Sequence, residues 1–97
     1  MRDYSLAKLA ELDLLAIARR LQKTQGSAQC KQYIEGLRDC FRFAAEDPTL
    51  GRRSEEVLPG LRWIGYNMHA FFYAIEAERV FIARVLPQDA FPTAPRS

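Results

Sequence analysis

The sequence is poor in the residues from which metal centres and disulfide scaffolds are built. Its 97 residues include two cysteines, Cys30 and Cys40, and a single histidine. On one helix the two cysteines would be about 15 Å apart, too far for a disulfide, and no CxxC pair or Cys/His cluster has zinc-site spacing. We therefore expect no metal and no cofactor, and we interpret both cysteines as small core residues.

Long apolar runs and a strong charge imbalance are also missing. No stretch approaches the ~18 apolar residues of a membrane helix, and Met1-Arg2-Asp3-Tyr4 does not resemble the start of a signal peptide. A net charge of +2 argues for neither a nucleic-acid partner nor an acidic one. We expect a cytoplasmic protein without membrane contact, folded as a single domain over residues 1–97.

The first half of the chain predicts a short strand and two helices. Residues 2–6 alternate polar and apolar side chains and predict a short strand. Residues 7–24 contain no glycine or proline and predict the first helix. Gly26 should end the first helix, Ser27 should cap the second, and Asp47-Pro48 should end the second near Glu46. The predicted core stripes are Ala10, Leu14, Ile17 and Leu21 in the first helix, and Cys30, Tyr33, Ile34, Leu37, Cys40, Phe41 and Ala44 in the second.

The second half predicts a loop followed by a β-meander. Residues 47–60, "DPTLGRRSEEVLPG", form a loop whose length suggests function or mobility. Three runs rich in aromatic and β-branched residues, Leu61–Tyr66, Met68–Glu76 and Val80–Leu86, predict antiparallel strands, and residues 87–97 should be an irregular tail. The predicted class is α+β in the order β-α-α-β-β-β, with a helical hairpin packed on a small antiparallel sheet.

The first helix carries a second apolar surface opposite its core stripe. Leu9, Leu12 and Ala16 fall on that side at 100° per residue, and they are ringed by Lys8, Arg19, Arg20 and Lys23. These leucines are either scattered surface residues, which are common, or a docking groove for an amphipathic, partly acidic partner segment.

Residues suited to catalysis are few. The chain has no glycine-rich phosphate loop and no nucleophile elbow, and His69 stands alone in a predicted strand. The strands do carry arginines and aromatics, which could hold RNA or simply pack and bind proteins. These residues are Arg62, Trp63, Tyr66, His69, Tyr73 and Arg84.

Arg84 is unexpected because it interrupts the apolar strand "VFIARVLP". A guanidinium in a half-buried strand is costly unless it is paired. Arg84 therefore either pairs with a carboxylate or with chain carbonyls, or it contacts a target.

Several local patterns, in this order, resemble the ParE/RelE superfamily of toxins from bacterial type II toxin–antitoxin systems. The matching pieces are "AELDLLAI", "YIEGLRDCF", "EDPTLG", "LPGLR", "HAFFYAIE" and "VFIARVLP". They span nearly the whole chain, and "PGLR" followed by a tyrosine-bearing strand and "RVL" is most similar to the ParE side. In ParE-like toxins a histidine or another polar residue often follows "RVL", whereas this chain has Pro87.

The resemblance implies a toxin that is not an enzyme, that poisons DNA gyrase and that is neutralised by a cognate ParD-like antitoxin. It implies that Leu9, Leu12, Ala16, Arg19, Arg20 and Lys23 bind the antitoxin, and that DNA is contacted only indirectly, through the antitoxin. Arg62, Tyr66, His69, Tyr73 and Arg84 are the candidates for target contact. The alternatives are a RelE-type ribosome-dependent mRNA endonuclease and a degenerate homologue that only binds antitoxin. The tail, with Arg96 but no tyrosine or histidine, lacks the general acid of the endonuclease.

Overall fold

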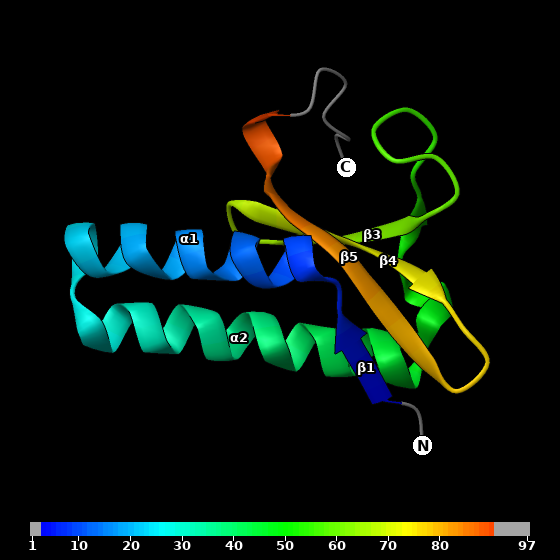
Figure 1. Ribbon diagram of the computed structural model, residues 1–97, viewed down its shortest axis with the longest axis horizontal. Coiled ribbons are helices and arrows are strands. Elements are labelled where there is room, and N and C mark those ends of the chain that lie inside the picture. Colours follow the sequence, from blue (N-terminus) through cyan, green and yellow to red (C-terminus); the bar gives the residue numbers. More distant parts are fainter. Residues whose placement is uncertain (1–2, 91–97) are drawn as a thin grey trace.

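A helical hairpin packs on one face of a five-stranded sheet in the computed structural model, which describes residues 3–90 (Figure 1). The strands lie in the order β1-β5-β4-β3-β2. The helices are α1 (Lys8–Gln25) and α2 (Ser27–Glu46), with short 3-10 helices η1 (Pro48–Leu50) and η2 (Gln88–Ala90). The strands are β1 (Asp3–Leu6), β2 (Arg52–Arg53), β3 (Arg62–Tyr66), β4 (His69–Ile75) and β5 (Arg79–Pro87).

The predicted fold class is confirmed, with one difference in strand direction. The meander β3-β4-β5 is antiparallel throughout. Strand β1, however, runs parallel to β5, with Tyr4 opposite Val80 and Leu6 opposite Ile82, so the sheet is mixed. The alternation within a four-residue strand marks its buried face but carries no information about the direction of its partner.

The connection between the helices corrects the predicted cap. Gly26, at φ 92°, is the whole link between α1 and α2 and occupies the N-cap position of α2. Ser27 is already the first helical residue, and its Oγ accepts a hydrogen bond from Gln22 Nε2 (3.2 Å) instead of capping the helix. A one-residue link needs the positive φ that glycine adopts readily.

Two further segments are more ordered than predicted. The predicted loop 47–60 contains η1 and the two-residue strand β2, which pairs with β3. At the other end β5 continues to Pro87, opposite His69, and η2 follows it, so the irregular tail does not begin at residue 87. Residues 91–97, including Arg96, lie outside the described residues.

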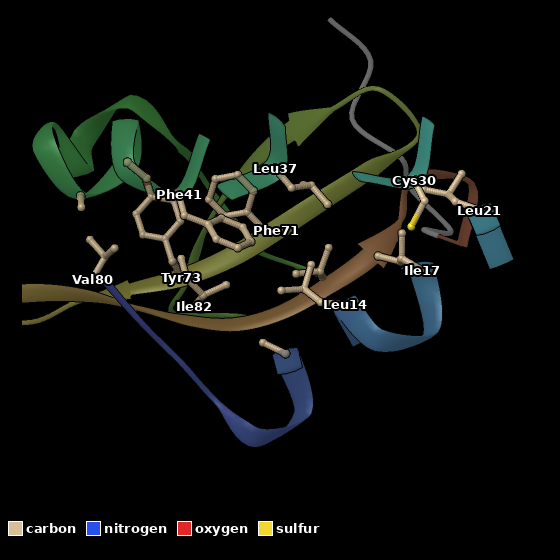
Figure 2. Close-up of a cluster of buried hydrophobic side chains, with 14 residues drawn as sticks. Leu14, Ile17, Leu21, Cys30, Leu37, Phe41, Phe71, Tyr73, Val80 and Ile82 are labelled. Carbon is tan, nitrogen blue, oxygen red and sulfur yellow. The ribbon is translucent and has the colours of Figure 1, made fainter. Parts of the chain in front are cut away.

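The main core fills the space between the helices and the sheet (Figure 2). All four residues of the predicted α1 stripe are buried, and Leu37 and Phe41 of α2 are fully buried. Phe41 meets Phe71 of β4 edge-to-face, with ring centroids 4.7 Å apart, an arrangement that aromatic pairs favour. Cys30 is buried in this core and Cys40 packs against it partly buried, as the sequence predicts, and both are free thiols.

A smaller cluster forms on the opposite face of the sheet. Ala70 and Phe72 alternate with Phe71 and Tyr73 along β4 and therefore point away from the helices. Residues of the loop after β2 and of the neighbouring strands pack against them, namely Val57, Leu58, Leu61, Trp63 and Leu86. None of the helices within residues 3–90 is long and apolar enough to cross a membrane.

Candidate functional site

One exposed side of α1 gathers the residues that the sequence predicts as a docking groove. Leu9 and Leu12 are 55% and 50% exposed, and Ala16 is exposed beside them. Leu15, 47% exposed, extends the same side. The sequence pattern did not include Leu15 because its helical angle lies between the core stripe and the opposite face.

Basic side chains border this apolar surface. Arg19, Arg20 and Lys23 follow it along α1 and Lys8 precedes it, all of them exposed. We call these eight residues the basic–apolar face: Lys8, Leu9, Leu12, Leu15, Ala16, Arg19, Arg20 and Lys23. Within residues 3–90 the ion pairs are Arg42–Asp39 and Arg84–Asp13, so the basic residues of this face are not neutralised by ion pairs with that part of the chain.

Asp13, at the border of this face, gives Arg84 its partner. Arg84 donates from Nε to Asp13 Oδ2 (2.8 Å) and from Nη2 to Oδ1 (3.0 Å). Its side chain is 34% exposed and that of Asp13 is 16% exposed. The hydrogen bonds to Asp13 raise the pKa of Arg84 above its ordinary value. Of the two alternatives for Arg84, the structure supports pairing with a carboxylate.

The same carboxylate also completes the edge of the sheet. Strand β1 ends at Leu6, opposite Ile82, and β5 continues beyond it. Val85 N–H then donates to Asp13 Oδ2 at 2.9 Å, so a side chain of α1 accepts the hydrogen bond that a longer β1 would have taken. The Asp13–Arg84 pair therefore fixes the exposed face of α1 relative to the sheet.

His69 lies in a packed aromatic cluster at one end of the sheet. Its Nδ1 is 2.7 Å from the Tyr33 hydroxyl of α2, and the Tyr33 and Tyr66 rings meet edge-to-face at 5.1 Å. Gly36 leaves room for Tyr66, because a Cβ at position 36 would collide with its hydroxyl. The sequence pattern assigned Tyr33 only to the core, so this partner of His69 was missed.

Burial lowers the pKa of His69 below 6.5, Arg20 lowers it further, and Asp89 partly opposes the shift. As the pH falls, His69 therefore becomes protonated in the unfolded chain before it does so in the folded chain. The contribution of neutral His69 to the free energy of unfolding is fully present above pH 6.5 and is lost as the pH falls toward the lowered pKa.

We predict that the imidazole resonance of this only histidine titrates below 6.5 in the folded protein, as proton NMR can measure. Arg20→Ala should move the midpoint upward, because it removes a nearby positive charge, and Asp89→Ala should move it downward. A titration midpoint at or above 6.5, or a midpoint that neither substitution shifts, would contradict the buried environment described for His69.

Arg62 and Tyr73 lie toward the other end of the sheet. In the register of β3 and β4, Tyr66 is opposite His69 and Arg62 is opposite Tyr73, so about 13 Å of strand separates the two pairs. The strand residues predicted as target contacts therefore do not converge on one site, and Arg62 is remote from His69.

Tyr73 is a correction to the predicted set. It is 0% exposed, and its hydroxyl donates to Pro48 O (2.6 Å) and accepts from Gly51 N–H (2.9 Å). A buried side chain engaged in this way cannot contact a target. Arg62 reaches the same segment, with Nη1 2.7 Å from Gly51 O.

Among residues 3–90 no group of three acidic, histidine or cysteine side chains is placed to hold a metal ion.

Comparison with known proteins gives one consistent family. Residues 4–90 match the family model described as the ParE toxin of the type II toxin–antitoxin system parDE. The chain is 31% identical over 86 residues to Toxin ParE1 of Mycobacterium tuberculosis, covering 88% of each chain. It is 32% identical over 89 residues to Toxin ParE1 of Caulobacter vibrioides, covering 92% of each.

Solved structures agree with the fold. A chain of the chromosomal ParDE system from P. aeruginosa is 15% identical and superposes with a TM-score of 0.77, over 90% of this chain and 96% of that one. A mutant of YafQ from E. coli is 14% identical, with a TM-score of 0.56 over 93% and 97% of the two chains. At such identities the likeness concerns the fold alone.

Proposed function

Because the chain belongs to the ParE toxin family of type II toxin–antitoxin systems, we propose that it poisons DNA gyrase and is neutralised by a ParD-like antitoxin docked on the basic–apolar face. The toxin would act as a binding protein and not as an enzyme. Its site of action would be the cytoplasm, where gyrase works.

The observation that carries the antitoxin site is the exposure of one continuous side of α1. Three leucines about half exposed are bordered by basic residues within a single helix face. An amphipathic helix could cover the leucines with its apolar stripe and place carboxylates against Arg19, Arg20 and Lys23. Membership of the ParDE family implies that such a partner exists.

The proposal that the toxin acts by binding and not by catalysis is supported by the arrangement of the strand residues. A ribonuclease needs its base, its acid and its phosphate-binding cation around one scissile bond. Here His69 is hydrogen-bonded to Tyr33, Arg84 is held by Asp13, and Arg62 lies at the other end of the strand pair. A poison that stabilises one state of its target needs only a complementary surface.

Leu12→Glu should weaken antitoxin binding about tenfold, because it removes apolar contact and adds a charge that repels an acidic partner. Isothermal calorimetry with the cognate antitoxin measures the change. Leu50→Glu is the matched control, since Leu50 is 57% exposed on η1, away from α1. Equal antitoxin affinity of the two variants, with unchanged circular dichroism spectra, would show that the antitoxin does not bind the basic–apolar face.

Expression without antitoxin tests the choice of target in cells. Gyrase poisoning predicts filamentation and a DNA-damage response while bulk mRNA stays intact. Cuts in mRNA at ribosomal A-site codons, abolished in His69→Ala or Arg62→Ala, would instead establish the endonuclease. If neither effect occurs, the chain is a degenerate homologue that binds antitoxin only.

A further inference from the structure

Strand β2 consists only of two arginines, and its position is fixed by pairing with β3 and by hydrogen bonds of the residue before it. Arg52 and Arg53 are both exposed, and they pair with Trp63 and Arg62 of β3. The preceding residue, Gly51, is buried and is fixed on both sides of its backbone. Its N–H donates to the buried Tyr73 hydroxyl and its carbonyl accepts from Arg62 Nη1. A Cβ at Gly51 would collide with that hydroxyl, so this contact requires glycine.

The two exposed guanidinium groups reach opposite sides of the sheet edge. Successive residues of a strand point to opposite faces, and Arg52 lies over the Trp63 ring, 5.9 Å from its centroid. Stacking on an aromatic ring orders a guanidinium while leaving its donors available. Arg53 is opposite Arg62, so a third positive charge lies on the adjacent strand.

We propose that this edge, formed by Arg52, Arg53 and Trp63, contacts the phosphate backbone of duplex DNA. A single carboxylate could satisfy only one of two cations that point apart, whereas a phosphodiester backbone presents charge continuously along its length. Backbone contacts of this kind position a protein on DNA without reading sequence. The proposed edge ends before the acidic residues Glu55 and Glu56, which follow β2, beyond Ser54, in the loop that leads to β3.

The inference deepens the proposed function and rests on it for the choice of polyanion, because gyrase holds duplex DNA while it is poisoned. It departs from the sequence-based expectation that DNA is reached only through the antitoxin. Direct binding to the duplex would add a weak, salt-sensitive interaction to whatever the toxin makes with gyrase itself.

Trp63 makes the surface testable, because it is the only tryptophan of the chain and lies within the proposed DNA-binding edge. Adding a 20-base-pair duplex to the purified protein at low salt should change the Trp63 emission, and labelled-duplex anisotropy measures the affinity. The double variant Arg52→Glu with Arg53→Glu should bind at least about tenfold more weakly. Its slope of log K against log salt should be shallower by about two, because each phosphate that the protein neutralises contributes about 0.9 to that slope.

A charge-matched control separates a defined surface from net charge. Lys31→Glu with Arg38→Glu changes the charge equally at two exposed positions of α2 and should bind almost like the unmodified protein. Equal weakening in both double variants, no change in Trp63 emission, or tighter binding of polyglutamate or single-stranded RNA than of the duplex would overturn the inference. If the β2 variant no longer binds the duplex but still poisons gyrase, the DNA interaction exists and is dispensable for poisoning. Duplex binding without any gyrase effect would refute the proposed function alone.

Discussion

Arg84→Ala is expected to lower the free energy of unfolding by about 2 kcal/mol, because hydrogen bonds to charged groups contribute about 1.5–3 kcal/mol each and this pair is partly exposed. The variant leaves the Asp13 carboxylate, 16% exposed, without its two guanidinium donors. Asp13→Ala should cost about 1 kcal/mol more, because Val85 N–H is then also deprived of its acceptor.

Urea denaturation of both single variants and of the double variant measures the coupling. The double variant should be more stable than the sum of the single changes predicts, because each single change already breaks the pair. Arg42→Ala is the matched control, since Arg42 forms an exposed pair with Asp39 that should contribute at most about 0.5 kcal/mol. Equal destabilisation by Arg84→Ala and Arg42→Ala would show that the partial burial of the Asp13–Arg84 pair adds nothing to its contribution.

Tyr73→Phe should destabilise the protein by about 2–4 kcal/mol, although it removes a single oxygen atom. The change leaves Pro48 O without its donor and Gly51 N–H without its acceptor, and each buried unsatisfied group costs about 1–3 kcal/mol. Chemical denaturation measures the destabilisation. The comparison is Tyr4→Phe, an identical change in a less buried ring that packs on Phe41 and that should cost under about 1 kcal/mol.

The alkaline behaviour of Tyr73 gives a second readout. Burial raises its pKa above 10.0, so the stability that comes from the neutral phenol is complete below pH 10. That stability is lost as the pH rises toward the raised pKa. Tyr73→Phe should remove this part of the alkaline slope. A Tyr73→Phe protein as stable as Tyr4→Phe, with the same alkaline slope as the unmodified chain, would contradict the stabilising role of the Tyr73 hydroxyl, which bonds to Pro48 and Gly51 before β2.

Periodicity predicted the helices and the meander because those elements bury one face over many residues. Ala10, Leu14, Ile17 and Leu21 are buried as the helical stripe requires, and the same geometry places Leu9 and Leu12 outside. The apolar surroundings of Arg84 also indicated correctly that it needs a partner, although that partner lies 71 positions away in sequence.

What the sequence did not predict depends on contacts between distant residues. Strand β2 is defined by its pairing with β3, and the preceding Gly51 is held by Tyr73 and Arg62 from distant parts of the chain. Two arginines carry no strand pattern of their own. Tyr73 was assigned to a surface because alternation gives the face of a strand but not what covers that face. The partner of His69 was missed because Tyr33 fits the α2 core stripe equally well.

Poisoning of gyrase by binding is the central proposal, and the cleaved-DNA fraction in a purified gyrase reaction tests it most directly. Supercoiled plasmid, gyrase and ATP are incubated with the antitoxin-free protein, and linear DNA is measured after the trapped enzyme is digested. We predict that linear DNA rises with toxin concentration, that a stoichiometric amount of antitoxin abolishes the rise, and that Leu12→Glu needs more antitoxin for the same protection. A linear fraction that stays at the level of gyrase alone, from folded protein that still binds its antitoxin, would contradict this mechanism.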